Sequence, residues 1–241
     1  MCLLAWNWNP QSDTPLLLIG NRDEFYARPT LPLAWWAQSD ILAGRDEEAG
    51  GTWLGVDRRG RLAALTNYRA PVPARKDSPS RGELVAAFLA DDATAPDYLA
   101  ALRARCEHYN PFNLLVYDGK TLMGMESRGA RVLEMAPGLG AVSNADFHTP
   151  WPKLVNLQNG LHAHLHQHHA TDPALWALLR NPSVAPDHAL PRTGLPLARE
   201  RALSAAFIAT PEYGTRASSV VRIHKTQVEF AQEGFDAAGS L

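Results

Sequence analysis

The sequence predicts an α+β fold of four layers, αββα, in which two mainly antiparallel sheets are flanked by helices. Its 241 residues suit one sizeable domain or two small ones, and its apolar fraction of 46% is enough for a buried core. Apolar runs with the length of strands come in blocks, and blocks of helical residues separate these. Single strands and single helices do not alternate, as they would in a parallel α/β fold. No internal repeat is visible, so we expect a single domain over residues 1–241.

The chain opens with two expected hairpins. Apolar runs at 2–8 and 15–20 flank a short polar turn, which is the pattern of a β-hairpin. Runs at 51–57 and 60–68 repeat this pattern. The proline-rich, polar stretch 70–80 is expected to be a loop.

Two helices and several strands are expected next. Ser80 and Glu83 have the spacing of a capping box before an apolar run, which predicts the start of a helix. A second helix is expected over 96–107, with Cys106 on its apolar face as a core residue. Short apolar runs between glycines then predict strands at 112–118, 120–126, 130–135 and 138–144.

The last third of the chain combines helices, a loop and a hairpin. Thr149 is expected to cap a helix that begins with proline and continues to about residue 169. Residues 173–180 continue as helix, and the proline-rich stretch 181–198 is expected to be a loop. The final hairpin is expected at 216–224 and 226–230.

The composition argues against several classes of partner. A formal net charge of −2 and a pI of 6.5 give no electrostatic reason to expect nucleic acid or an anionic membrane. Two cysteines cannot build a disulfide framework, and they favour a reducing compartment. The N-terminal run lacks the pattern of a signal peptide, and no apolar stretch of about 18 residues occurs. We therefore expect a cytoplasmic protein without a membrane span.

Cys2 is the first candidate for chemistry. Cysteine is small enough for Met1 to be removed in front of it, which would leave a thiol and an α-amine on one residue. The amine has a pKa of about 7.7–8.0 and the thiol one of about 8.5, so the amine can accept the thiol proton near neutral pH. Such a residue can attack an amide or ester carbonyl without a histidine.

The charged run Asn21–Arg22–Asp23–Glu24 follows the second apolar strand, which we expect to pair with the strand that carries Cys2. Arg22 would then supply a positive charge near the thiolate, and Asp23 would orient the α-amine. Glu24 is the alternative for the second role, because adjacent residues of a strand face opposite sides.

Further polar residues stand at the ends of other apolar strands. Asn67 and Asn144 each follow such a strand and have the side-chain amide that donates to a developing oxyanion in acyl transfer. Arg216 precedes the last apolar strand, where it could bind a substrate carboxylate or the thiolate.

Six motifs occur along the chain: MCLLAW, NRDEFYARPT, GGTWLGV, LTNYR, VSNADFHTPWPK and YGTRASS. Together they resemble the NRDE family, also called the transport and Golgi organisation 2 family, from residue 2 to about residue 221. That family is similar to N-terminal-nucleophile (Ntn) hydrolases with an αββα sandwich, of the bile salt hydrolase and penicillin V acylase type.

The resemblance implies a catalytic set and a fold. It carries the hydrolases' functional residues onto Cys2, Arg22, Asp23, Asn67, Asn144 and Arg216. Arg222 is the alternative to Arg216 in another register, and the Gly-Thr-Arg motif favours Arg216. The relatives space their arginine and aspartate as Arg-x-x-Asp, whereas Arg22 and Asp23 are adjacent.

These observations support two hypotheses of different classes. The first is an N-terminal cysteine amidohydrolase or acyltransferase that acts on a non-peptide amide or thioester bond of a small-molecule substrate, without a cofactor. The alternative is a non-catalytic protein on the same scaffold that binds and transports haem or an acyl-CoA lipid, as the resemblance to the family implies.

Five histidines crowd the end of the expected helix, at positions 162, 164, 166, 168 and 169. A metal or haem site is one interpretation. A solvated helix C-terminus is the other, because the helix dipole favours positive charge there. No known metal-binding spacing accompanies these histidines, so no metal site is expected.

Overall fold

A computed structural model of the chain describes residues 2–71, 74–166 and 172–240. The chain divides into two compact units, each with one sheet and its own helices. Unit 1 comprises Met1–Ala27, Arg69–Pro71 and Pro137–Leu241. Unit 2 comprises Arg28–Tyr68 and Val72–Ala136.

Unit 1 contains a six-stranded sheet in the order β10-β1-β2-β11-β12-β13, and all of its neighbouring strands are antiparallel. The strands are β1 (Cys2–Trp8), β2 (Leu16–Phe25), β10 (Gly138–Val142), β11 (Tyr213–Ile223), β12 (Val228–Asp236) and β13 (Gly239–Ser240). β1 and β2 are buried along almost their whole length.

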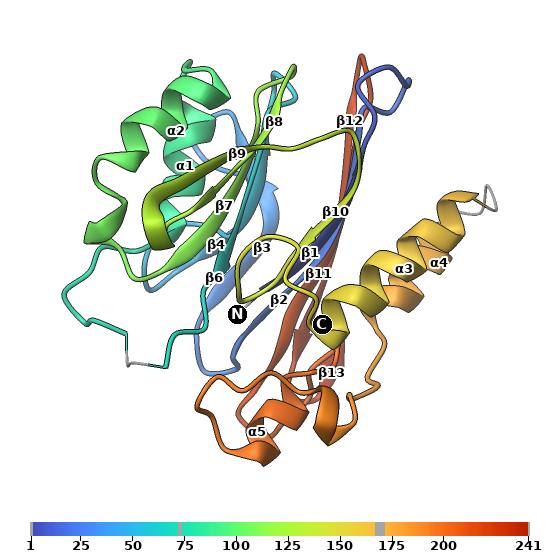
Figure 1. The fold of residues 1–241 in the computed structure, drawn as a ribbon. Coiled ribbons are helices and arrows are strands. Elements are labelled where there is room, and N and C mark those ends of the chain that lie inside the picture. Colours follow the sequence, from blue (N-terminus) through green and yellow to red (C-terminus); the bar gives the residue numbers. More distant parts are fainter. Residues whose placement is uncertain (1, 72–73, 167–171, 241) are drawn as a thin grey trace. The chain divides into compact units, whose positions relative to one another are not determined.

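One face of this sheet carries the helices α3 (Pro152–His166) and α4 (Asp172–Leu179), as Figure 1 shows. Leu154, Leu157 and Leu161 recur at helical spacing on α3 and form the apolar stripe that meets the sheet. The strands contribute alternate residues to the same core, among them Leu3 and Ile19. A short helix, α5 (Leu197–Ala202), follows the proline-rich segment.

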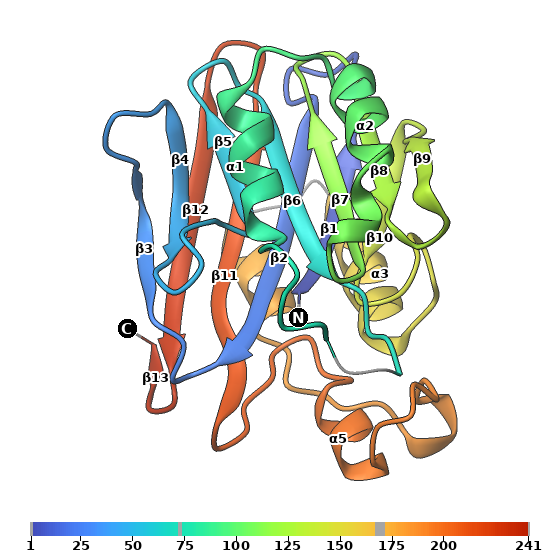
Figure 2. The ribbon, with the colours of Figure 1, turned by 90° about the vertical axis from the view of Figure 1, so that its left-hand side faces the viewer.

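Unit 2 contains a seven-stranded antiparallel sheet in the order β3-β4-β5-β6-β7-β8-β9. The strands are β3 (Thr30–Trp35), β4 (Ile41–Asp46), β5 (Leu54–Asp57), β6 (Leu62–Asn67), β7 (Phe112–Tyr117), β8 (Leu122–Glu126) and β9 (Arg131–Glu134). The helices α1 (Gly82–Ala90) and α2 (Ala95–Arg103) cover one face of it, as Figure 2 shows.

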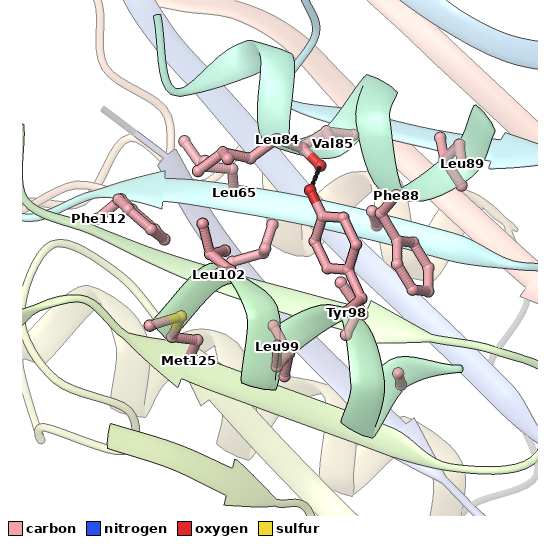
Figure 3. Close-up of a cluster of buried hydrophobic side chains, with 14 of the residues drawn as sticks. Leu65, Leu84, Val85, Phe88, Leu89, Tyr98, Leu99, Leu102, Phe112 and Met125 are labelled. Carbon is pink, nitrogen blue, oxygen red and sulfur yellow. Dashed lines mark hydrogen bonds between the residues drawn. The ribbon is translucent and has the colours of Figure 1, made fainter. Parts of the chain in front are cut away.

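The core between these two helices and their sheet is almost entirely apolar (Figure 3). Phe88 and Leu99 are fully buried there, and the Tyr98 hydroxyl donates to the Leu84 carbonyl at 2.7 Å. Cys106 lies in this cluster, which confirms its predicted role as a core residue.

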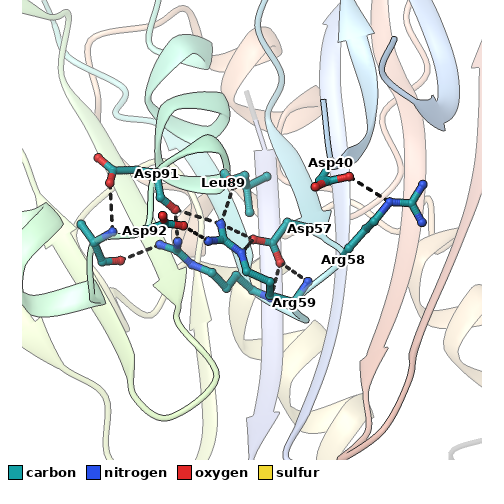
Figure 4. Close-up of polar contacts among 9 residues, drawn as sticks. Asp40, Asp57, Arg58, Arg59, Leu89, Asp91 and Asp92 are labelled. Atoms are coloured by element: carbon teal, nitrogen blue, oxygen red, sulfur yellow. Dashed lines mark hydrogen bonds and ion pairs between the residues drawn. The ribbon is translucent and has the colours of Figure 1, made fainter. Parts of the chain in front are cut away.

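A polar network links the β5–β6 turn to the end of α1 (Figure 4). The Arg59 guanidinium pairs with Asp57 and Asp92 and donates to the carbonyls of Leu89 and Asp91. Since the last carbonyls of a helix have no partner within it, Arg59 stabilises the C-terminal end of α1.

The predicted α+β class, with two antiparallel sheets and helices on them, is confirmed. Differences occur at particular elements. β2 continues to Phe25, so the charged run from Asn21 to Glu24 lies within the strand instead of following it. The edge strand β3 and its neighbour β4 were not predicted.

Two helix starts also differ in detail. The residue that caps α1 is Arg81, without a side-chain hydrogen bond, so the capping box of Ser80 and Glu83 is not formed. α3 begins with proline as expected, but this proline is Pro152. The prediction of one domain over 1–241 stays a prediction.

Within the part of the chain that the structure describes, no helix has both the length and the apolar character needed to cross a membrane.

Gly140 of β10 lies directly under the indole of Trp6, which is 1% exposed. A Cβ at position 140 would overlap the indole ring atoms. We therefore expect Gly140→Ala to lower the free energy of unfolding by about 1–3 kcal/mol, because the core must shift to accept the methyl group. Urea denaturation would measure this loss.

The control is the same substitution in a Trp6→Leu background, where the smaller side chain leaves room for the methyl group. Gly140→Ala should cost less there than in the wild type. Equal costs in the two backgrounds would show that contact with Trp6 is not the cause.

Candidate active site

The pairing of β1 with β2 determines which side chains share a face with Cys2. Cys2 lies directly opposite Arg22, and Leu3 lies opposite Asn21. Since residues paired across two antiparallel strands point to the same side, Arg22 and Cys2 share one face of the sheet. Asp23 points to the other face, the one that packs against α3 and α4.

The Cys2 side chain is buried, with 5% of its surface exposed. Burial raises the pKa of its thiol, and the negative charge of Asp23 raises it further, while the positive charge of Arg22 acts in the opposite direction. A buried thiol with a raised pKa keeps its proton at neutral pH. Nucleophilic chemistry at Cys2 therefore requires a base that removes this proton.

Asp23 is fully buried on the helix-facing side of the sheet. Its Oδ1 accepts a hydrogen bond from the Thr215 hydroxyl at 2.9 Å, and its Oδ2 lies 3.9 Å from the ammonium of Lys153. Burial raises the pKa of the Asp23 carboxyl, and Lys153 and Thr215 counteract this effect. Glu24 is more exposed, and its carboxylate accepts from the backbone N–H of Phe25.

Asn144 follows β10 and reaches Cys2 with its side-chain amide. Nδ2 donates to the Cys2 carbonyl at 3.4 Å, and Oδ1 accepts from Lys153 at 3.3 Å and from the Ser143 hydroxyl at 3.2 Å. An ammonium group can only donate hydrogen bonds. Lys153 therefore fixes the orientation of the amide, with the oxygen toward itself and the nitrogen toward Cys2.

Lys153, the second residue of α3, is almost completely buried. Burial lowers the pKa of its ammonium to about 8; the charge of Arg69 acts in the same direction, and Asp23 and Cys2 act against it. Lys153 is not among the site residues predicted from the sequence. Its signal was its place at the end of the motif VSNADFHTPWPK, which also contains Asn144.

Arg216 lies at a bulge of β11, next to Ala217, the residue paired with Arg22. Its guanidinium donates to the backbone carbonyls of Phe25, Tyr26 and Phe235. It therefore ties the end of β2 to β12. Its predicted contact with a substrate or with the thiolate stays a prediction.

Arg222 lies at the other end of the same strand. It is opposite Leu17 and forms an ion pair with Asp172 at 2.7 Å. Arg222 lies five positions along the strand from Ala217, which corresponds to roughly 16 Å. The register thus places Arg216, rather than Arg222, at the end of the sheet where Cys2 lies.

Asn67 is the last residue of β6 in unit 2, where it pairs with Phe112. Its role as a second oxyanion donor stays a prediction.

The histidines of α3 are partly described. The rings of His162 and His166 lie in edge-to-face contact, with their centroids 4.2 Å apart. His168 and His169 lie outside the described residues. Within 2–71, 74–166 and 172–240, no three His, Cys, Asp or Glu side chains are grouped as a metal ion would require.

The low pKa of Lys153 predicts a specific pH dependence of stability. The ammonium loses its proton near pH 8 in the folded protein, but only near the ordinary value of 10.5 in the unfolded chain. Between these values the unfolded state binds more protons, so the stability of the wild type should rise with pH relative to Lys153→Met. The gain should be about 3 kcal/mol, and urea unfolding at several pH values would measure it.

Lys225→Met is the matched control, because Lys225 is an exposed lysine of the same unit that pairs with Asp13. Its stability should follow that of the wild type over this range. A constant difference between wild type and Lys153→Met would rule out the titration of Lys153 in this interval.

Comparison with known proteins places the chain in a fold class. Over 96% of its length it resembles the mutant C2A conjugated bile acid hydrolase of Clostridium perfringens, with a TM-score of 0.51, 9% identity and 92% of that chain covered. It also resembles the N-acylethanolamine-hydrolyzing acid amidase ortholog of Caenorhabditis elegans over 95% of its length, with a TM-score of 0.50, 12% identity and all of that chain covered. The predicted Ntn-hydrolase-like fold is thereby confirmed.

Sequence comparison identifies the family. The chain is 35% identical to a Transport and Golgi organization protein 2 homolog of Bos taurus, over 98% of this chain and 95% of the relative. It is 30% identical to Transport and Golgi organization protein 2 of Drosophila melanogaster, over 99% of this chain and 95% of the relative. The model of the Transport and Golgi organisation 2 family matches residues 1–236, and the chain therefore belongs to this family.

Proposed function

We propose that the protein is an N-terminal cysteine amidohydrolase or acyltransferase that acts on a non-peptide amide or thioester bond. The observation that carries this proposal is the surroundings of Cys2. Arg22 is paired with it across the sheet, and the amide nitrogen of Asn144 contacts its carbonyl. Lys153 and Asp23 extend this contact into a buried polar cluster.

The reaction begins with removal of Met1, which frees the α-amine of Cys2. This amine takes the proton of the thiol, and the resulting thiolate sulfur attacks the carbonyl carbon of the substrate. The tetrahedral oxyanion collapses to a thioester on Cys2 as the amine returns the proton to the leaving group. Water, or an acceptor alcohol or amine, then attacks the thioester, gives its proton to the amine, and restores the thiol.

Each neighbour of Cys2 has a role in this scheme. Arg22 favours the thiolate, against the effect of burial on the thiol. Asp23, held by Thr215 and Lys153, orients the α-amine. Asn144 and Asn67 stabilise the oxyanion, and Arg216 contacts a charged group of the substrate.

The substrate class is taken from the proteins of similar fold, whose names describe the hydrolysis of a conjugated bile acid and of an N-acylethanolamine. The nucleophile must be a free thiol, and both Cys2 and Cys106 are free. A reducing location such as the cytoplasm would keep them so.

Cys2→Ala should abolish the burst and the steady-state turnover of a panel of acyl amides and thioesters, because it removes the nucleophile. Release of the leaving group, followed by stopped-flow absorbance, measures both phases. The wild type should also gain the mass of the acyl group, and its intact mass should lack Met1.

Cys106→Ala is the matched control, because Cys106 is the other free cysteine and lies in the apolar core of unit 2. This variant should retain turnover. Turnover that survives in Cys2→Ala would sink the proposal. A panel without turnover, together with saturable absorbance changes on titration with haemin, would favour the binding and transport alternative.

The proposed function also predicts that Lys153 acts through Asn144. Lys153→Met removes the charged one of the two donors to the Asn144 amide oxygen, so acylation should slow by about tenfold, the size of one charge-assisted hydrogen bond. Asn144→Ala should slow it by about 100-fold, as loss of an oxyanion donor does. Single-turnover acylation of Cys2 gives these rates.

The double variant tests the coupling between the two residues. If Lys153 acts by orienting the amide, Lys153→Met should add nothing once Asn144 is alanine. Lys153→Arg keeps a donor and should restore part of the rate. Additive effects of the two substitutions would instead show that Lys153 acts independently of Asn144.

A further inference from the structure

The buried charges of unit 1 gather around one place. Among its described residues, five charged side chains fall in the buried class. Four of them belong to the candidate site or contact a residue of it, and the fifth, Glu200, pairs with one of these four, Arg69. They are Arg22, Asp23, Arg69, Lys153 and Glu200. Three are cations and two are carboxylates, so the cluster has an excess of positive charge beside a nucleophilic thiol.

Arg69 is joined directly to the candidate site through the backbone. Its N–H donates to the Asn144 carbonyl at 2.7 Å, and the Asn144 side chain contacts Cys2. The Arg69 guanidinium lies over the ring of Trp151, 4.7 Å from its centroid. Trp151 immediately precedes α3, which carries Lys153.

Glu200 occupies only one corner of the Arg69 guanidinium. Its Oε2 accepts from Nη1 of Arg69 at 2.6 Å. Its Oε1 accepts from both the backbone N–H and the hydroxyl of Thr193. Both oxygens of Glu200 are therefore engaged, and this carboxylate does not bridge the rest of the guanidinium.

The remaining edge of Arg69, formed by Nε and Nη2, is buried and has no hydrogen-bond acceptor among the described residues. Buried guanidinium N–H groups without acceptors are costly, so such a pair requires an explanation. Two adjacent N–H groups on one edge of a guanidinium match the spacing of two oxygens of a carboxylate or a phosphate. The acceptor that fits this edge is therefore a carboxylate or a phosphate.

We propose that this edge of Arg69 is an anion-binding subsite, which binds a carboxylate or phosphate group on the acyl substrate of Cys2. This inference rests on the proposed function. It narrows the substrates of that function to amides or thioesters with a negatively charged group near the reacting carbonyl.

Two alkylating reagents test the subsite without knowledge of the substrate. Iodoacetate and iodoacetamide both transfer a two-carbon group to the Cys2 sulfur with loss of iodide, and only iodoacetate carries a carboxylate. Peptide mass spectrometry gives the rate constants at Cys2. The ratio of the rate constant for iodoacetate to that for iodoacetamide should exceed the same ratio for glutathione. It should fall by about tenfold in Arg69→Met, which removes a charge-assisted pair of hydrogen bonds.

Arg180→Met is the matched control. Arg180 is an arginine of the same unit that pairs with Glu233 on the surface, and its loss should leave the ratio unchanged. Arg69→Lys keeps the charge but loses the two-pronged edge, so its ratio should lie between those of Arg69→Met and the wild type. A circular-dichroism melt of each variant identifies any that fails to fold.

Competition in the wild type identifies the anion and does not depend on the variants. At constant ionic strength, acetate or inorganic phosphate should slow the reaction of Cys2 with iodoacetate more than its reaction with iodoacetamide, which carries no carboxylate. The stronger competitor shows whether the edge prefers a carboxylate or a phosphate. If neither slows the reaction with iodoacetate more, or if Arg69→Met keeps the wild-type ratio, then water alone satisfies the edge and the subsite is refuted.

The subsite and the proposed function fail in different ways. Alkylation needs only the thiol, so an Arg69-dependent ratio without turnover of any acyl substrate would support the subsite and refute the hydrolase. Acyl-enzyme formation with a ratio independent of Arg69 would do the reverse. A folded wild type in which Cys2 reacts with neither reagent would contradict both.

Discussion

The antiparallel register of β1 and β2 is the constraint on which the arrangement around Cys2 depends. Cys2 lies opposite Arg22, so these two share a face, and Asp23 points into the layer of helices. A shift of one residue would exchange these faces. The shift is opposed by the apolar residues of both strands, since Leu3 and Ile19 would leave the core that α3 completes. The apolar packing of β1 and β2 against α3 therefore determines which polar side chains lie on the same face as Cys2.

Buried charge is the second feature that shapes the site. Removing an ion from water is costly, and two of the buried cations have partners that offset part of this cost. Lys153 lies near Asp23 and donates to Asn144, and Arg69 pairs with Glu200 and stacks over Trp151. Asn144 connects the two cations, because its side chain accepts from one and its backbone carbonyl from the other. Perturbed ionisable groups gather in this way at functional sites more often than in structural cores.

The two cysteines show why burial alone does not define a role. Burial raises the pKa of both thiols. Cys106 lies in an apolar cluster, and its sulfur contacts the carbonyls of Arg103 and Ser127. Cys2 instead has an arginine paired with it and an asparagine amide on its own carbonyl. In unit 2, the Arg59 guanidinium donates to carbonyls at the end of α1 and stabilises that end of the helix.

The α+β class, the first hairpin and the core position of Cys106 could be predicted from the sequence, because they follow from local alternation and composition, whereas Cys2 as the nucleophile stays a prediction. The sequence missed β3, an edge strand that contains Pro32 and is mostly exposed, so no buried alternation marks it. It also missed Lys153 and Arg69, since lysine and arginine are ordinarily expected in solvent. Their burial depends on long-range contacts: Arg69 pairs with Glu200, 131 positions away in the sequence, and no local pattern encodes such a contact.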